Sequence, residues 1–189
     1  MRAELIGLPE PNWFHHGEAI LDLLDEHRPV TCVELGSNRG CSAIAVARLI
    51  RTWGGRLTCV DRWQGGSDGF VDLDTFRTNI VAAGVDDIIT AVQRTTMDAA
   101  ALWEGDIDYL YVDADHTRDG CESDLELWWP CLRVGGLIAG DDYDDVAGVP
   151  SEGVTAAWDE FEANHRQTFV RQATSATPYH GRLIWGVKR

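Results

Sequence analysis

The chain has 189 residues, with 31 acidic and 16 basic side chains and a formal net charge of −15. This length favours a single domain, which we expect to span residues 1–189, and 44% hydrophobic with 25% charged residues is typical of a globular protein. The acidic balance argues against a nucleic acid or an anionic membrane as the main partner. No apolar run is long enough to cross a bilayer, and the first residues lack the apolar core of a secretory signal, so we expect a cytoplasmic protein.

The cysteine pattern also favours a cytoplasmic protein. Their number is odd, and no two of them form the Cys-x-x-Cys pair that a zinc or redox site would favour. Several lie inside apolar runs, so we expect buried thiols at Cys32, Cys41, Cys59, Cys121 and Cys131.

Short apolar runs alternate with amphipathic stretches along the chain. The apolar runs predict buried strands at residues 31–35, 56–60, 88–92, 107–112 and 136–139. Helical spacing predicts helices at residues 41–52, 72–83, 98–103 and 120–128, and an amphipathic segment at 17–26 belongs to a helical cap formed by residues 1–29. This alternation indicates a parallel sheet covered by helices on both faces.

The last part of the chain departs from this alternation. A predicted helix at 154–165 precedes two strand candidates, 168–173 and 182–187. The connection between these strands, residues 174–181, is too short for a crossover helix. The two strands should therefore form an antiparallel hairpin.

A glycine turn joins the first strand to the helix behind it. The turn reads Glu-Leu-Gly-Ser-Asn-Arg-Gly over residues 34–40, and glycine there lets the backbone bend sharply and approach a ligand. Asn38 stands at the middle glycine of the dinucleotide fingerprint Gly-x-Gly-x-x-Gly, which weakens an NAD interpretation. The cofactor contacts predicted from this turn are Glu34, Gly36, Ser37, Asn38, Gly40 and Ser42.

Asp61 follows the second strand, where a carboxylate can accept two hydrogen bonds from a ribose diol in an NAD or an S-adenosylmethionine site. The alternative is a solvated loop aspartate. A cationic sulfonium suits the neighbourhood of Glu34 and Asp61 better than a pyrophosphate does. Arg62 and Trp63 come next in the chain and are included among the predicted cofactor contacts.

The glycine turn followed by Val60-Asp61 resembles the first two motifs of the class I S-adenosylmethionine-dependent methyltransferases, and the C-terminal hairpin matches that family as well. The resemblance runs from about Val30 to Val187. It implies an α/β fold, a Rossmann-like seven-stranded and mostly parallel sheet with a C-terminal antiparallel hairpin. It also implies adenine contacts from Met97 and Asp98, although Asp98 is an equally good candidate for a helix N-cap.

A second group of acids follows two later strands. Asp113 ends the fourth strand, and Asp141 and Asp142 end the fifth. If these strands are neighbours, the carboxylates converge at the ligand-binding edge of the sheet, and a bound Mg²⁺ would relieve their repulsion. Chance aspartates at loop starts are the alternative for any one of them.

This pattern resembles the metal-dependent small-molecule O-methyltransferases. The resemblance makes Asp113, Asp141 and Asp142 the metal ligands, with Asp113 also lining the cofactor site. The catalytic base of the Asp-x-x-(Lys or His) motif falls on His116. Catechol-type enzymes have lysine there, whereas histidine is similar to the macrocin- and mycinamicin-type sugar O-methyltransferases. Asp115 either orients His116 or contacts a ligand.

The expected reaction is Mg²⁺-dependent O-methylation of a small hydroxylated metabolite, a sugar or a phenol. An NAD-dependent oxidoreductase and a non-catalytic nucleotide-binding protein remain alternatives. An N-terminal segment with Trp13, His15 and His16 could fold over the substrate, and His180 could approach it from the hairpin. Residues 64–73 and 144–153 are candidate lids, and a second copy of this short chain could complete the substrate wall as a homodimer.

Overall fold

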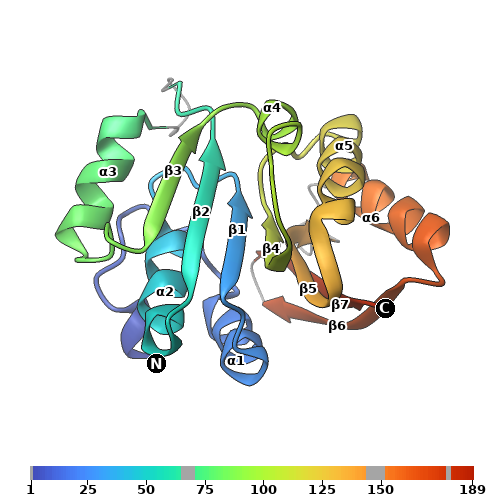
Figure 1. The fold of residues 1–189 in the computed structure, drawn as a ribbon, viewed down its shortest axis with the longest axis horizontal. Helices are drawn as coiled ribbons and strands as arrows, with labels where there is room; N and C mark the ends of the chain where they lie inside the picture. The colour runs from blue at the N-terminus through green and yellow to red at the C-terminus, as the bar shows by residue number, and fades with distance from the viewer. Residues whose placement is uncertain (1, 65–70, 144–151, 178–179) are drawn as a thin grey trace.

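The computed structural model describes residues 2–64, 71–143, 152–177 and 180–189 (Figure 1). Its sheet has seven strands in the order β3-β2-β1-β4-β5-β7-β6. The strands are β1 (Thr31–Leu35), β2 (Arg56–Asp61), β3 (Ile89–Gln93), β4 (Ile107–Val112), β5 (Leu132–Tyr143), β6 (Phe169–Thr177) and β7 (His180–Lys188). The first five are parallel, and β7 lies antiparallel between β5 and β6. The predicted fold class is confirmed.

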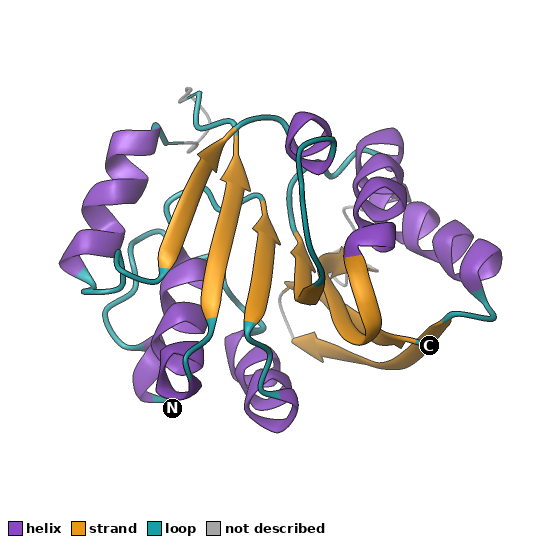
Figure 2. Cartoon of the chain, viewed as in Figure 1, coloured by secondary structure: helices purple, strands orange, loops and turns teal. Residues whose placement is uncertain are grey.

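Helices cover both faces of this sheet (Figure 2). They are α1 (Gly17–His27), α2 (Cys41–Ile50), α3 (Leu73–Ala82), α4 (Thr96–Ala100), α5 (Arg118–Trp128) and α6 (Glu152–His165), with short 3₁₀ turns at Ala3–Leu5, Arg51–Trp53 and Trp129–Cys131. None of these helices, within the part of the chain that is described, has the length and apolarity needed to cross a membrane.

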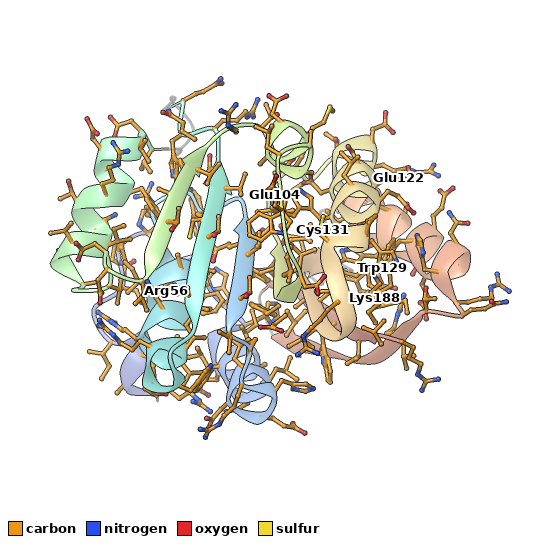
Figure 3. The ribbon with its side chains drawn as sticks, in the orientation of Figure 1. Arg56, Glu104, Glu122, Trp129, Cys131 and Lys188 are labelled. Atoms are coloured by element: carbon orange, nitrogen blue, oxygen red, sulfur yellow. The ribbon has the colours of Figure 1, made fainter. Side chains whose placement is uncertain are left out.

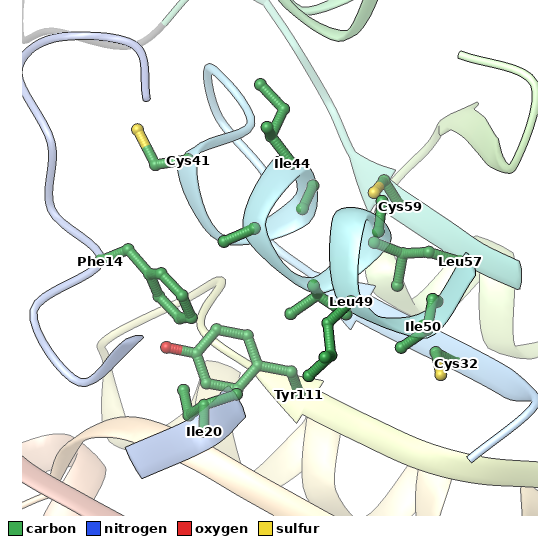
Figure 4. Packing of buried hydrophobic residues seen from close by; sticks show 14 of the residues in the cluster. Phe14, Ile20, Cys32, Cys41, Ile44, Leu49, Ile50, Leu57, Cys59 and Tyr111 are labelled. Atoms are coloured by element: carbon green, nitrogen blue, oxygen red, sulfur yellow. The ribbon is translucent and has the colours of Figure 1, made fainter. Parts of the chain in front are cut away.

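Two apolar cores result from the alternation of side chains along the strands. In β4, Tyr109 and Tyr111 belong to the core under α1, α2 and α3, while Leu110 and Val112 belong to the core under α4, α5 and α6. Figure 4 shows Phe14 of the N-terminal region and Ile20 of α1 packed beside Tyr111 in the first core. The first core therefore ties the N-terminal region to the centre of the sheet.

Three of the buried tryptophans, Trp128, Trp129 and Trp158, lie in the second core. Trp128 and Trp129 are buried within the second core, so they pack inside this chain. The only lysine of the sequence, Lys188, lies beside Trp129 (Figure 3) and donates hydrogen bonds to the carbonyls of Trp129 at 2.7 Å and Leu132 at 2.6 Å. These contacts fasten the end of β7 to the start of β5.

The cysteines are all free, as expected. Cys32, Cys41, Cys59 and Cys121 are buried, whereas Cys131 is only partly buried because it lies in the surface turn before β5.

The predicted boundaries were furthest from the structure in three places. The fifth strand spans Leu132–Tyr143 instead of 136–139, because Gly135, at φ +80°, and Gly136 are accommodated inside the strand. The helix predicted at 98–103 is Thr96–Ala100, capped by Thr95. The hairpin strands reach Thr177 and begin again at His180, so their connection is much shorter than residues 174–181.

The topology fixes where a ligand binds. Strands β1, β2 and β3 lie side by side in chain order, and the next strand, β4, lies on the other side of β1. Ligands of open parallel sheets bind outside the carboxyl ends of the strands at such a reversal. Near this edge the pairing of β5 with β7 shifts register between Gly140 and Tyr143. Asp141 and Asp142 therefore lie in an irregular part of the strand.

Candidate active site

The glycine turn packs directly against the end of β4. Gly36 has φ +83°, and a Cβ on it would lie 2.0 Å from the carbonyl oxygen of Asp113. The backbone N–H of Asp113 in turn donates to the carbonyl of Leu35 at 2.9 Å. Gly40, at φ +91°, is the N-cap residue of α2. Only glycine adopts these conformations without strain and leaves room for the contact with Asp113.

Asp61 holds the glycine turn in place. Its Oδ2 accepts hydrogen bonds from the backbone N–H groups of Ser37 at 3.0 Å and Asn38 at 2.8 Å, and its Oδ1 accepts one from Trp63 at 2.8 Å. An ionised carboxylate has about four acceptor positions, so Oδ1 keeps one for a ligand. The structure thus gives Asp61 a supporting role, and the ribose contact stays a prediction.

Glu34 lies beneath the turn and is 1% exposed. Its Oε1 accepts a hydrogen bond from the Ser42 hydroxyl at 2.9 Å. Burial raises the pKa of Glu34 to about 8, because the charged carboxylate has lost its water. A cation bound above the turn would favour the ionised form of Glu34.

A small pocket of about 40 Å³ opens above the turn. It is lined by Trp13, Phe14, Gly36, Ser37, Asn38, Arg39, Cys41, Ser42 and Asp113. The N-terminal segment, defined here as residues 8–16, folds over it: the Arg39 guanidinium donates to the carbonyl of Glu10 at 2.8 Å and lies 5.6 Å from the Trp13 ring centre. We expected this segment to fold over the substrate, and in the structure it lies over the glycine turn.

Trp63 does not line this pocket. It is buried, packs on Phe76 with ring centres 4.6 Å apart, and donates its indole N–H to the carbonyl of Asn38 at 2.7 Å. Trp63 therefore supports the turn from behind. Arg62 is exposed at the same edge of the sheet.

The second predicted group brings Asp113, His116 and Asp142 together. One ligand atom from each lies within 4.8 Å of the others. His116 stands between the two acids, with Nε2 3.4 Å from an Asp113 oxygen and Nδ1 3.2 Å from an Asp142 oxygen. Asp142 has φ +58°, an uncommon conformation for a non-glycine residue that turns its carboxylate toward His116.

The charges in this group strongly affect one another. Loss of most of its contact with water raises the pKa of Asp113 to about 7. The hydrogen bond with Asp113 raises the pKa of His116 to about 9. The positive charge of the protonated His116 imidazole thus balances the carboxylates. A divalent cation bound here would take over that role. Two carboxylates and an imidazole at the ends of adjacent strands suit a hard or borderline divalent ion.

Asp141 faces a different neighbourhood. Its Oδ2 accepts a hydrogen bond from the Tyr111 hydroxyl at 3.1 Å, and its Oδ1 accepts one from the backbone N–H of Asp142 at 2.9 Å. Nε2 of His16 lies 3.4 Å from the same Oδ1. Of the three predicted metal ligands, the structure brings Asp113 and Asp142 together and turns Asp141 toward Tyr111 and His16.

Asp115 supports the turn that carries His116. Its Oδ1 accepts a hydrogen bond from the backbone N–H of Thr117 at 2.9 Å, and this bond lowers the pKa of Asp115. A Cβ on Gly120 would lie 2.2 Å from Cγ of Asp115, and one on Gly153 would lie 2.7 Å from the carbonyl of His116. The first turns of α5 and α6 thus hold the His116 turn from two sides.

The predicted adenine contacts lie on α4. Thr95 is the N-cap, because its hydroxyl oxygen accepts a hydrogen bond from the backbone N–H of Asp98 at 3.0 Å. The alternative of Asp98 as N-cap was wrong, since the threonine three residues earlier takes that role. Met97 is 59% exposed at the same edge of the sheet, and both adenine contacts stay predictions.

Parts of two predicted lids, residues 65–70 and 144–151, lie outside the described residues, as does the side chain of His180. Among the residues near the strand-end acids, His16 received no specific role from the sequence. A histidine pair directly before an amphipathic helix is the only signal that the sequence offers for it.

A reversed strand order with a glycine turn and strand-end acids at its carboxyl edge defines the class I methyltransferase architecture. A family model described as a methyltransferase domain matches residues 33–143, which is more than half of the chain. The chain therefore belongs to this family, and it is an S-adenosylmethionine-dependent methyltransferase.

Solved structures of low sequence identity share this fold. Cofactor-bound Rv0187 from MTB has a TM-score of 0.76 at 16% identity, covering 97% of this chain and 84% of that chain. The Bacillus cereus O-methyltransferase in complex with S-adenosylhomocysteine has a TM-score of 0.69 at 19% identity, covering 92% and 80%. TomG, the O-methyltransferase of tomaymycin synthesis from Streptomyces achromogenes, has a TM-score of 0.66 at 17% identity, covering 92% and 79%.

Proposed function

We propose that the protein methylates a hydroxyl oxygen of a small metabolite, a sugar or a catechol-like phenol, with the help of a divalent cation. The observation that carries this proposal is the position of His116 between Asp113 and Asp142, beside the pocket above the glycine turn. Asp113 belongs to both places, because it lines the pocket and contacts His116. A proton acceptor and a charged group therefore adjoin the predicted position of the cofactor.

The residues of the glycine turn bind and orient the cofactor. When bound, S-adenosylmethionine supplies an electrophilic methyl group beside a positive sulfur. The negative charge of Asp61 favours that cation, the bound cation would in turn favour the ionised form of Glu34, and the fixed backbone of Gly36–Asn38 restricts its position. Trp13 and Phe14 form the opposite wall of the pocket.

Asp113 and Asp142 would hold the cation, with Asp141 as the third ligand that the resemblance implies. A bound divalent cation would lower the pKa of the acceptor hydroxyl and orient an adjacent oxygen. His116 is the proton acceptor in this proposal. At a pKa of about 9 its imidazole holds a proton at neutral pH, but positive charge on the neighbouring carboxylates would lower that pKa and free a ring nitrogen to take the proton.

The family match disfavours the oxidoreductase and the non-catalytic alternatives. The net charge of −15 supports a small acceptor over a nucleic acid, because a phosphate backbone would be repelled.

Calorimetric titration with S-adenosylhomocysteine, with and without Mg²⁺ and with NADH as the control ligand, tests the proposal. We expect micromolar binding of S-adenosylhomocysteine and a separate Mg²⁺ heat that Asp113→Ala removes. Vicinal diols and catechols are then screened as methyl acceptors. A wild-type protein that binds S-adenosylhomocysteine but methylates catechols equally well in chelator would contradict the metal-dependent mechanism. Binding of NADH alone would contradict the proposed cofactor.

A further inference from the structure

His16 is buried beside the carboxylate of Asp141. Its side chain is 1% exposed, and Nε2 lies 3.4 Å from Oδ1 of Asp141. Neither ring nitrogen has a hydrogen-bond partner among the described residues, so the contact has the distance of an ion pair without hydrogen-bond geometry. His16 occupies the N-cap position of α1, but its side chain makes no capping hydrogen bond. Helix capping therefore does not explain why the imidazole is buried.

Asp141 is a fixed partner for this histidine. Its carboxylate accepts hydrogen bonds from the Tyr111 hydroxyl and from the backbone N–H of Asp142, so its orientation is set from β4 and from β5. A buried imidazole is unfavourable unless a polar group compensates for the lost water. Asp141 is the group that the structure places within reach of His16.

The same N-terminal segment forms a wall of the cofactor pocket. Trp13 and Phe14 line the pocket, and Phe14 packs edge-on against Tyr111 with ring centres 6.4 Å apart. Tyr111 is the residue that donates to Asp141. Two or three residues along the chain therefore separate the pocket wall from the contact with the strand-end acid.

Two contacts join the start of the segment to the region of the glycine turn. The Cys41 thiol approaches the carbonyl of Pro9 at 3.2 Å, and the Arg39 side chain donates to the carbonyl of Glu10 at 2.8 Å. Both partners lie in the glycine turn or directly after it, so they cannot fix the segment relative to β5. The segment is joined to the central strands by Phe14, which packs on Tyr111 of β4, and by His16, which is the contact with Asp141 of β5.

We propose that His16 is a positioning residue that fastens the N-terminal segment to Asp141 and thereby fixes Trp13 and Phe14 over the cofactor. Without the contact, the packing of Phe14 on Tyr111 alone holds this end of the segment, and we expect the pocket wall to open more readily. This inference rests on the proposed cofactor binding, and the wild-type protein tests that part separately. If the wild type does not bind S-adenosylhomocysteine, the proposed function fails, whatever the His16 variants do.

Two substitutions of similar size separate the polar contact from simple packing. His16→Leu fills the space without a donor, whereas His16→Gln keeps an N–H that can reach Asp141. We expect His16→Leu to weaken S-adenosylhomocysteine binding at least ~5-fold and His16→Gln to stay within ~2-fold of the wild type. His27→Ala, at the far end of α1, is the matched control and should leave the affinity unchanged.

Hydrogen exchange of residues 8–16 gives a second readout that does not depend on a ligand. It should be faster in His16→Leu and unchanged in His16→Gln and His27→Ala. If His16→Leu binds as tightly as the wild type, or if Leu and Gln weaken binding equally, the proposal is overturned. If His16→Leu does not fold, Asp141→Ala must accelerate exchange of residues 8–16 in the same way, and unchanged exchange there overturns the proposal.

Discussion

The glycine turn and the His116 group stabilise their acidic side chains in different ways. In the turn, backbone N–H groups satisfy Asp61, and Glu34 below it is kept neutral by a pKa of about 8. In the other group, Asp113 and Asp142 are balanced by the side chain of His116, whose pKa rises to about 9. Backbone N–H groups already satisfy Asp61 in the first region, whereas in the second the side chain proposed as the proton acceptor also serves as the counter-ion. The second region should therefore respond far more strongly to added positive charge.

The largest effect is expected at Asp113, which belongs to both regions. Asp113→Ala should abolish turnover, by ~10⁴-fold or more, because it removes a cation ligand and the partner of His116 together. Activity and the Mg²⁺ heat are measured side by side, with Asp119→Ala on the exposed first turn of α5 as the control. Asp113→Ala with the full activity of the wild type in the presence of Mg²⁺ would contradict the metal mechanism.

Glu34 should make the protein less stable as the pH rises. Its pKa is about 8 in the folded state and ~4.3 in an unfolded chain, so its burial costs little below pH 4 and increasingly more up to pH 8. Glu34→Gln removes the charge and keeps an acceptor for Ser42. Urea unfolding at several pH values should show the variant gaining up to ~4 kcal/mol on the wild type between pH 4 and pH 8. A difference independent of pH would mean that Glu34 is ionised throughout.

Gly36 tests the close contact between the two regions. Gly36→Ala should destabilise the protein by ~3 kcal/mol, because a Cβ would lie 2.0 Å from the carbonyl of Asp113 and the φ of +83° adds strain. Gly84→Ala is the matched control, since Gly84 also has a positive φ, +66°, but open space around its Cβ position. Thermal unfolding measures both, and similar losses for the two variants would mean that the contact contributes nothing beyond backbone strain.

The smallest effect is expected at Asp142. Asp142→Asn keeps an oxygen ligand and removes one negative charge from His116, so turnover should fall by ~10-fold or less. Its Mg²⁺ heat should weaken without disappearing, which distinguishes it from Asp113→Ala. Loss of activity as complete as that of Asp113→Ala would show that both negative charges are needed.

Much of this arrangement could be predicted from sequence, because it depends on buried strands and on where they end. The strands at Thr31–Leu35 and Ile107–Val112 were predicted to the residue, and Asp113, which follows the second of them, lies at the expected edge. The direction in which a side chain points was harder to predict. Simple alternation along β5 fails between Gly140 and Tyr143, where the register shifts, so the different surroundings of Asp141 and Asp142 depend on how β5 pairs with β7.

The role of His16 could not be predicted for a related reason. Its partner, Asp141, is 125 positions further along the chain, and the contact exists only after β5 has paired with its neighbours. The packing of Trp63 on Phe76 could not be predicted either, because it depends on contacts with α3, and its cofactor contact stays a prediction. Local patterns therefore placed the acids, and long-range packing decided what each one contacts.

Titration of His116 by nuclear magnetic resonance, with and without Mg²⁺, tests the central claim most directly. His116→Gln assigns the signal by its loss. We predict a pKa of about 9 without the metal and a fall of at least ~2 units when Mg²⁺ binds, because the cation replaces the imidazolium as counter-charge for Asp113 and Asp142. A pKa of His116 that stays near 9 in saturating Mg²⁺ would contradict its role as the proton acceptor of a metal-dependent methyl transfer.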